Sequence, residues 1–220
     1  MKRVLVTGGS RGIGKAIVGL FRERGWEVLA PSRKEMNLCD RKSIANYCLS
    51  LDGPIDAIIN NAGINNIAKL DQLSDDLFEE MLQVNLMAPV QIVRCLQEKL
   101  KENKIGHIVN VSSIWGFVSK EGRLGYAAAK TGIIGATRTM ALELGRDNVL
   151  VNAVAPGFVN TELTKQNNTP EQIAEIESKL PLGRMAEPEE IAKFVYFLAS
   201  DENTFITGQT ILIDGGYTCQ

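Results

Sequence analysis

Thr7-Gly8-Gly9-Ser10-Arg11-Gly12-Ile13-Gly14 is the stretch that decides the fold. A short apolar segment, residues 3–6, precedes it, and an amphipathic helical pattern that includes Ala16, Ile17, Leu20 and Phe21 follows it. A strand, a glycine turn and a helix form the context that a phosphate-binding loop requires. The glycines allow a tight turn, and the helix N-terminus supplies free N–H groups and partial positive charge. A plain glycine turn is the alternative, because the spacing is GxxxGxG rather than GxGxxG.

Apolar strand patterns and helical patterns alternate along the whole chain. Further strands are expected at residues 26–30, 55–60, 106–112, 149–155 and 209–214, and further helices at 41–51, 75–102, 126–145 and 187–199. This alternation predicts an α/β fold with a doubly wound parallel (Rossmann) sheet, in one domain over residues 1–220.

The segment after the second expected strand is unusually short. Only Lys34, Glu35 and Met36 separate the turn at residues 31–33 from residues 37–40. A crossover with a full helix takes more than ten residues. One crossover helix is therefore expected to be missing or shortened after strand 2, and Asp40 is expected to cap the helix that begins at about residue 41.

Composition indicates an ordinary globular protein of 220 residues, with 45% hydrophobic and 23% charged residues. The net charge of -2 gives no electrostatic reason to expect nucleic acid or an anionic membrane as a partner. With one histidine in the chain, no His-ligated metal site is expected. The four cysteines form no CxxC pair, and no apolar run suits an export signal or a membrane span, so we expect reduced thiols and a cytoplasmic location.

Tyr126-Ala-Ala-Ala-Lys130 opens a helical run of otherwise small and apolar residues. Tyr and Lys four apart in a helix lie on one face, and no carboxylate between residues 127 and 136 could pair with Lys130. Because an ammonium near a phenol stabilises the phenolate, we expect Lys130 to lower the pKa of Tyr126 from about 10 toward neutrality. Tyr126 would then serve as a general acid or base. A surface lysine beside a half-buried tyrosine is the alternative.

Polar and small residues end three of the expected strands, at 60–63, 112–113 and 156–157. Open α/β sheets bind ligands at the carboxyl ends of their strands. Asn85 lies inside the expected long helix, between Val84 and Leu86. A buried asparagine must be hydrogen-bonded, so its role is either structural or functional.

The turn after the second strand lacks the acid that usually binds the ribose 2′-hydroxyl in dinucleotide folds. Pro31-Ser32-Arg33-Lys34 stands there instead. Arg33 and Arg11 together could hold a 2′-phosphate, which a carboxylate would repel, so the sequence favours NADP over NAD. Two solvated arginines are the alternative interpretation.

Together these features resemble the short-chain dehydrogenase/reductase family, from residue 3 to about residue 217. The motifs that carry the resemblance, in order along the chain, are TGGSRGIG (7–14), NNAG (60–63), the Asn of QVNL (83–86), the second Ser of VSSIWG (111–116), YAAAK (126–130) and PGFVNT (156–161). The resemblance implies an oxidoreductase that reduces a carbonyl to an alcohol by hydride transfer from a nicotinamide cofactor.

The resemblance assigns roles to four residues. Tyr126 is similar to the family's catalytic acid/base, and Lys130 to the lysine that lowers its pKa and holds the ribose hydroxyls. Ser113, rather than its neighbour Ser112, matches the serine that hydrogen-bonds the substrate oxygen. Asn85 matches the asparagine that supports a proton-relay water.

The resemblance also implies a set of cofactor-binding residues that surround the dinucleotide. Ser32 stands where NAD-preferring members carry an acid, and Arg33 follows it as in NADP-preferring members. The full set is Gly8, Ser10, Arg11, Gly12, Ile13, Gly14, Ser32, Arg33, Leu38, Asn61, Ala62, Gly63, Tyr126, Lys130, Pro156, Gly157, Val159 and Thr161. No residue is expected to hold a metal.

Within the family, residues 208–216 and 181–191 are most similar to 3-oxoacyl-(acyl carrier protein) reductases. Docking of an acyl carrier protein needs a basic patch beside the cleft, for which Lys104 and Arg146 are candidates, although Asp147 could displace the second. A reductase of a small keto-sugar or hydroxyketone is the alternative substrate class. A non-catalytic NADP-sensing module is a third possibility, which the presence of both Tyr126 and Lys130 argues against. An extended epimerase does not fit 220 residues.

Two further expectations concern assembly and access to the site. Residues 161–182 are polar and helix-prone, and are expected to form a substrate lid. The resemblance implies a homotetramer or homodimer that pairs through the helices at 75–102 and 126–145.

Overall fold

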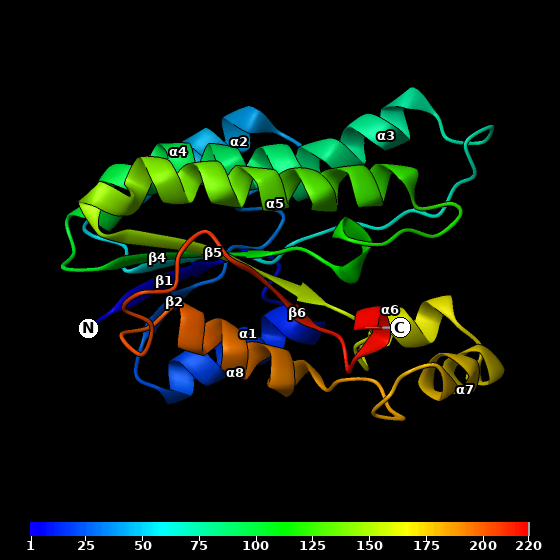
Figure 1. Cartoon of the computed structure of the whole chain (residues 1–220). Helices are drawn as coiled ribbons and strands as arrows, with labels where there is room; N and C mark the ends of the chain where they lie inside the picture. Colours follow the sequence, from blue (N-terminus) through cyan, green and yellow to red (C-terminus); the bar gives the residue numbers. More distant parts are fainter. Residues whose placement is uncertain (220) are drawn as a thin grey trace.

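The computed structural model describes residues 1–219, apart from the side chains of Leu163 and Asn167. Over this range one parallel sheet of six strands forms the centre of the molecule, in the order β2-β1-β3-β4-β5-β6 (Figure 1). The strands are β1 (Arg3–Val6), β2 (Glu27–Leu29), β3 (Ala57–Asn60), β4 (Gly106–Val111), β5 (Val149–Pro156) and β6 (Thr210–Ile213). The predicted doubly wound α/β fold is confirmed.

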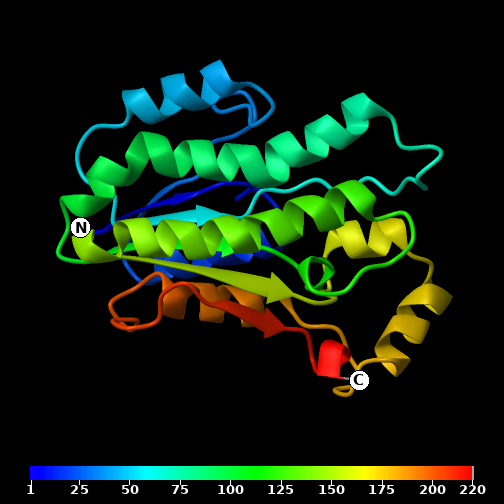
Figure 2. The same ribbon diagram turned by 45° about the horizontal axis from the view of Figure 1, so that its top comes forward.

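Helices cover both faces of the sheet. Helices α2 (Arg41–Ser50), α4 (Ala88–Lys101) and α5 (Leu124–Leu144) pack on one face, and α1 (Gly12–Glu23) and α8 (Pro188–Leu198) pack on the other (Figures 1 and 2). Helix α3 (Asp75–Leu82) continues through a π-helical turn, Gln83–Met87, into α4. Helices α6 (Glu162–Asn167) and α7 (Pro170–Ser178) lie beyond the carboxyl end of β5. Short 3₁₀ turns are Ile114–Gly116, Gly145–Asp147 and Tyr217–Cys219.

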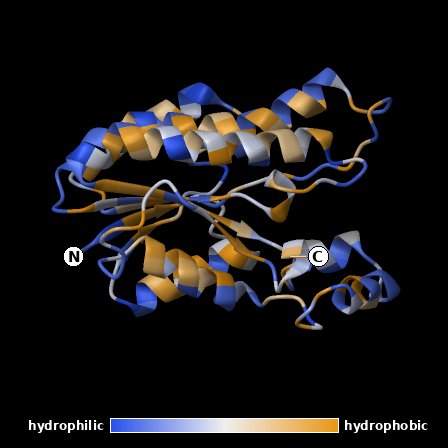
Figure 3. Cartoon of the chain, viewed as in Figure 1, coloured by the Kyte–Doolittle hydropathy of each residue, from blue (hydrophilic) through white to orange (hydrophobic). Residues whose placement is uncertain are grey.

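Each face of the sheet carries its own hydrophobic core, and the helices turn apolar sides toward it (Figure 3). Every residue of β3, β4 and β5 is buried. Burial on both faces is typical of a parallel sheet and explains the near-continuous apolar runs of these strands. On the α1/α8 face, Phe21 makes edge-on ring contacts with Trp26 and Tyr196, with centroids 5.1 and 5.0 Å apart.

The short connection after β2 lacks a full crossover helix, as expected. No helix lies between β2 and residue 40, and the Asp40 carboxylate caps α2 by accepting the Lys42 N–H at 2.8 Å. Residues 37–40 form turns rather than a strand, so the chain passes through α2 directly to β3. Ser74 caps α3 through its hydroxyl, which accepts the Leu77 N–H at 3.3 Å.

Residues 1–219 contain no helix that is both long enough and apolar enough to cross a membrane. In the same part of the chain, no three His, Cys, Asp or Glu side chains gather in a group that could hold a metal ion. Each of the four cysteines is a free thiol.

A buried polar chain fixes α5 against the middle of the sheet. Asn60 Nδ2 donates to Asn110 Oδ1 at 2.8 Å, and Asn110 Nδ2 donates to Thr137 Oγ1 at 2.9 Å. The Thr137 hydroxyl in turn donates to the carbonyl of Ile133 at 2.7 Å. Because Asn110 and Thr137 are fully buried, each link replaces a hydrogen bond to water. The helix that carries residues 126 and 130 is thereby held in register with β4.

Replacing Asn110 should cost stability out of proportion to its size. In Asn110→Ala the Asn60 amide loses its partner and stays buried, so we expect the free energy of unfolding in urea to fall by about 2–3 kcal/mol. The exposed Asn66→Ala serves as the control, with an expected change below about 0.5 kcal/mol. Equal values for both variants would contradict the structural role of this chain of hydrogen bonds.

Candidate active site

The predicted site residues gather at the carboxyl ends of β1, β3, β4 and β5, as an open α/β sheet requires. The glycine loop follows β1, residues 61–63 follow β3, Ser113 follows β4, and residues 157–161 follow β5. Tyr126 and Lys130 come from the first two turns of α5, which crosses above these ends.

The glycines of the loop at residues 7–14 are required by close approach of the backbone. Gly8 has a φ of +68°, and a Cβ on it would lie 2.8 Å from the Cα of Ala62. A Cβ on Gly14 would collide with the carbonyl oxygen of Gly8. A side chain at either position would therefore close the cradle at the N-terminus of α1, where a phosphate can meet free N–H groups.

Residues 7 and 61 brace this loop. The Thr7 hydroxyl accepts the N–H groups of Asn61 and Ala62, both at 3.0 Å. The Asn61 amide donates to the carbonyls of Thr7 at 3.0 Å and Gly8 at 3.2 Å. Asn61 and Ala62 thus shape the loop, a structural task that the motif alone did not indicate.

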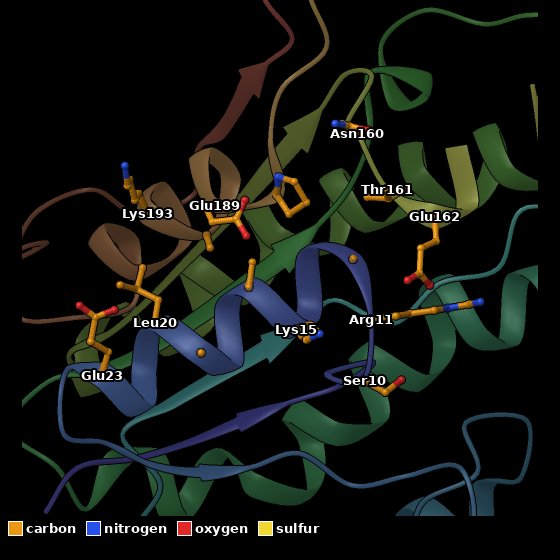
Figure 4. A pocket seen from close by; sticks show the side chains of 15 residues that line it. Ser10, Arg11, Lys15, Leu20, Glu23, Asn160, Thr161, Glu162, Glu189 and Lys193 are labelled. Atoms are coloured by element: carbon orange, nitrogen blue, oxygen red, sulfur yellow. The ribbon is translucent and has the colours of Figure 1, made fainter. Parts of the chain in front are cut away.

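A groove of about 580 Å³ begins beside the loop (Figure 4). Ser10 and Arg11 border it from the start of α1, and Thr161 and Glu162 face them from the start of α6. A Cβ on Gly12 would lie 3.3 Å from the Thr161 methyl group, so these two positions are neighbours across the groove. The groove then runs between α1 and α8 toward Leu20 and Lys193, and Tyr126 is not among the residues that line it.

The remaining cofactor candidates hold the rim of the site. Gly157 packs against Asp214, since a Cβ there would lie 2.8 Å from the Asp214 Cα. Val159 is buried and pairs with Ala186 in an isolated β-bridge. The Leu38 carbonyl accepts the Gln83 amide at 3.0 Å, which fixes the turn that follows β2. Ile13 packs against the core beneath the loop, and Pro156 ends the buried strand β5.

Glu35 is a residue that sequence reasoning missed. Its carboxylate accepts the Ser32 N–H at 2.8 Å, and hydrogen bonds from the Ser32 backbone and then its hydroxyl lower the pKa of Glu35. A carboxylate therefore stands beside Ser32 after all, supplied from three residues further along. Arg33 is exposed next to it. The signal in the sequence was the Ser-x-x-Glu spacing, in which the acid reaches back to the first residue of a turn.

Ser112 and Ser113 point to different partners. The Ser112 hydroxyl donates to the Lys130 carbonyl at 2.9 Å, so its hydrogen bond holds α5 in place. Hydrogen bonding by the Ser113 side chain lowers the pKa of the Tyr126 phenol, and the Ser113 hydroxyl accepts the Trp115 N–H at 3.3 Å. The structure therefore selects Ser113 as the serine that faces the phenol.

Lys130 and Asn85 lie against Gly63. A Cβ on this glycine would lie 2.8 Å from Asn85 Oδ1 and 3.6 Å from Lys130 Nζ. Asn85 is buried in the π-helical turn and exchanges two hydrogen bonds with the backbone of Ile64, at 2.9 and 3.0 Å. A π-helical turn inside a helix often marks a functional position, because it re-aims a side chain.

The ammonium of Lys130 is buried and donates to the carbonyl of Val111 at 2.7 Å. It also lies 5.5 Å from the centre of the Tyr126 ring. Burial lowers the pKa of Lys130 to about 8. The expected desolvated lysine beside the tyrosine is therefore present, with a backbone carbonyl as its partner rather than a carboxylate.

The expectation that the pKa of Tyr126 falls toward neutrality is wrong, because burial raises it. Burial raises the pKa of Tyr126, and the two groups that lower it are Ser113, through its hydrogen bond, and then Arg123, through its charge. The reason is that the Lys130 ammonium sits over the ring and is engaged by Val111, whereas Ser113 reaches the hydroxyl. Arg123 is a second residue that the motif did not indicate.

The basic patch expected beside the cleft lies elsewhere. Lys104 precedes β4 and Arg146 precedes β5, at the amino ends of the strands, whereas Ser113 follows β4. A strand of six residues such as β4 spans roughly 20 Å. Asp147 also pairs with Lys101 at 3.2 Å and reduces the positive charge there. Within one chain, then, Lys104 and Arg146 do not border the site.

Comparison with known proteins now identifies the family. A family model described as Enoyl-(Acyl carrier protein) reductase matches residues 40–218. The 3-oxoacyl-[acyl-carrier-protein] reductase FabG of Thermotoga maritima is 38% identical over 240 residues, which cover 98% of this chain and 97% of that protein. The chain belongs to the short-chain dehydrogenase/reductase family.

Solved members of the short-chain dehydrogenase/reductase family share this structure. A 4-hydroxyisoleucine dehydrogenase complexed with NADH matches with a TM-score of 0.94 and 33% identity, over 100% of both chains. A putative NAD(P)-dependent gluconate 5-dehydrogenase from Beutenbergia cavernae with bound NADP also has a TM-score of 0.94, at 31% identity, and covers 100% of this chain and 97% of that one. The first holds NADH and the second NADP, so a nicotinamide cofactor is supported.

Burial of Lys130 should appear as a pH dependence of stability. Its pKa is about 8 when folded against 10.5 as the ordinary value, so the unfolded chain binds more protons between these pH values. The free energy of unfolding of the native protein should therefore rise with pH across this window, relative to Lys130→Met, by about 2–3 kcal/mol. Urea denaturation of both proteins at pH 7 and at pH 10.5 measures this difference. A constant difference would show that the ammonium is not buried.

Proposed function

We propose that this chain is an NADP(H)-dependent oxidoreductase that reduces a carbonyl group to an alcohol, with Tyr126 as the general acid. The observation that carries the proposal is the buried ammonium of Lys130, 5.5 Å from the centre of the Tyr126 ring, beside a Ser113 side chain that lowers the pKa of the phenol. The fold and the family support a nicotinamide cofactor, which when bound supplies the hydride.

The residues around the loop fit such a cofactor. Gly8, Gly12 and Gly14 leave room for a pyrophosphate at the N-terminus of α1, and a Cβ on Gly8 or Gly14 would close that room. Asn61, Ala62 and Gly63 would lie under the adenosine ribose, and Lys130 and Tyr126 would hold the second ribose. Val159 and Thr161 would contact the carboxamide and a phosphate.

The chain's own groups then perform the acid chemistry. Ser113 and Tyr126 donate hydrogen bonds to the substrate oxygen, where negative charge develops. Because burial raises the pKa of Tyr126, the phenol carries its proton at neutral pH and can give it to that oxygen. The Lys130 ammonium near the ring then stabilises the phenolate, and Lys130 with Asn85 provides a path by which the proton is replaced.

A 3-oxoacyl thioester on an acyl carrier protein is the first candidate substrate, because a 3-oxoacyl-[acyl-carrier-protein] reductase is among the most similar relatives. A small keto compound, such as a keto-sugar or hydroxyketone, is the second candidate. It is favoured by the position of Lys104 and Arg146, which in one chain are a strand's length from the site. A carrier protein would then have to dock on another surface or on a second subunit.

Access, assembly and location complete the proposal. Residues 161–182, which include α6 and α7, act as the substrate lid. The chain assembles as a homotetramer or homodimer through α4 and α5, whose outer faces include the exposed Leu142. The free cysteines support a cytoplasmic location.

Removing one oxygen tests the general acid. Tyr126→Phe should lower the rate of NADPH-dependent reduction of a panel of carbonyl compounds by about 10²- to 10⁴-fold, because the phenol no longer supplies the proton. Tyr47→Phe, on α2, is the matched control and should retain the native rate. NADPH oxidation followed at 340 nm gives both rates. Equal rates for the native protein and Tyr126→Phe would end the enzyme proposal and favour a non-catalytic NADP-binding module.

Two substitutions test the choice of cofactor. Arg33→Asp should shift the preference from NADPH toward NADH by about 10- to 100-fold, because a carboxylate repels a 2′-phosphate and a charge-assisted contact is lost. Glu35→Gln should shift it the other way, because it removes the negative charge beside Ser32. Dissociation constants for both cofactors measure these changes. An unchanged ratio in Arg33→Asp would remove the 2′-phosphate argument.

A further inference from the structure

Arg123 is the N-cap residue of α5 and comes three residues before Tyr126. It lies half-buried beneath the cleft, with its guanidinium carbon 5.9 Å from the centre of the Trp115 ring. Its Nη1 atom is fully buried and has no hydrogen-bond partner among the described residues. A buried N–H donor without an acceptor is costly, so such an atom calls for an explanation.

The charge of this guanidinium is also uncompensated. In the described part of the chain, no carboxylate forms an ion pair with Arg123. Burial lowers the pKa of Arg123, and the opposing influence comes from the Tyr126 phenol. A buried charge is normally paired. The first turn of α5 also contributes no acidic residue and no side-chain cap.

Position along the helix brings Arg123 near Tyr126. Residues three apart on a helix share a face, so the guanidinium and the Tyr126 hydroxyl lie on one side of α5. Each senses the charge of the other. Trp115, which stacks with Arg123, is also part of the wall of a cavity of about 340 Å³ that Val118 and Tyr217 help to line.

We propose that Arg123 is a specificity-determining residue that binds a carboxylate carried by the substrate itself, a few bonds from the carbonyl that Ser113 and Tyr126 hold. A guanidinium presents two parallel N–H donors that match the two oxygens of a carboxylate, and among the described residues no acceptor engages Nη1. Of the two candidate substrate classes, this inference selects the small keto compounds over the carrier-protein thioester, and among them free oxo acids of short chain length rather than neutral esters. This inference rests on the proposed carbonyl reduction at Tyr126.

A matched pair of substrates tests the inference. A four-carbon 3-oxo acid and its methyl ester differ in the carboxylate alone, and both are reduced with NADPH by the native protein, Arg123→Gln and Arg123→Lys. In Arg123→Gln, kcat/KM for the acid should fall about 10- to 100-fold more than kcat/KM for the ester, with the additional loss mainly in KM, because both substrates share any effect of Arg123 on Tyr126 and the acid alone loses its charged partner. Arg123→Lys should retain part of the preference for the acid, because it keeps the charge and loses the fork. The exposed Arg22→Gln, on α1, controls for net charge and should behave as the native protein.

Equal losses for the acid and the ester in Arg123→Gln would overturn the inference, because they would assign Arg123 to the pKa of Tyr126 or to packing. The proposal that Arg123 binds a carboxylate would also be overturned if the native protein preferred a phosphorylated ketone to the oxo acid and Arg123→Gln lost that preference. If Arg123→Gln does not fold, the test is the ratio of kcat/KM for the acid to kcat/KM for the ester in Arg123→Lys.

A binding measurement separates this inference from the proposed reaction. The four-carbon 3-hydroxy acid should raise the melting temperature of the native protein and Arg22→Gln, and not that of Arg123→Gln. If neither substrate is reduced but the 3-hydroxy acid raises the melting temperature as described, the proposed reaction is wrong and the proposed carboxylate site is supported. The absence of the shift from the native protein would overturn the site.

Discussion

The hydrogen bond between the Lys130 ammonium and the Val111 carbonyl is the interaction on which the site depends. It joins α5 to the carboxyl end of β4 at 2.7 Å, and within residues 1–219 no carboxylate forms an ion pair with this ammonium. The hydrogen bond from Ser112 to the Lys130 carbonyl, at 2.9 Å, adds a second link between the same two elements. Because both links are buried, they fix the height of Tyr126 above the sheet.

The same lysine is also costly to the fold, since its pKa is brought down to about 8 by burial. A protein selected for stability alone would place an apolar side chain there. Retaining a buried ammonium beside a phenol is typical of sites at which charge is used in chemistry. Burial raises the pKa of Tyr126 and favours the protonated phenol, whereas Ser113 and Arg123 lower that pKa and favour loss of the proton.

Close approach of the backbone governs the cofactor side of the cleft in a comparable way. Gly8, Gly14 and Gly63 each lie where a Cβ would meet backbone or a functional side chain. Thr7 and Asn61 join the loops after β1 and β3 through four hydrogen bonds, so the cradle is formed by the protein before any ligand arrives. At the end of β2, Glu35 and Arg33 place opposite charges within one turn.

The sequence by itself determined the alternating fold, the glycine loop, the caps at Asp40 and Ser74, and the grouping of Asn85, Ser113, Tyr126 and Lys130, because each depends on local spacing or on the rule that strand ends meet. Local spacing could not reveal which groups a side chain meets across the chain. The tertiary structure alone decided that residues 37–40 form no strand and that Lys104 and Arg146 lie at the far edge of the sheet. It also decided that Glu35 returns a carboxylate to Ser32, that Val111 engages Lys130, and that the pKa of Tyr126 rises. The physical reason is that burial and partner choice are set by elements far apart in sequence, and these determine both charge and exposure.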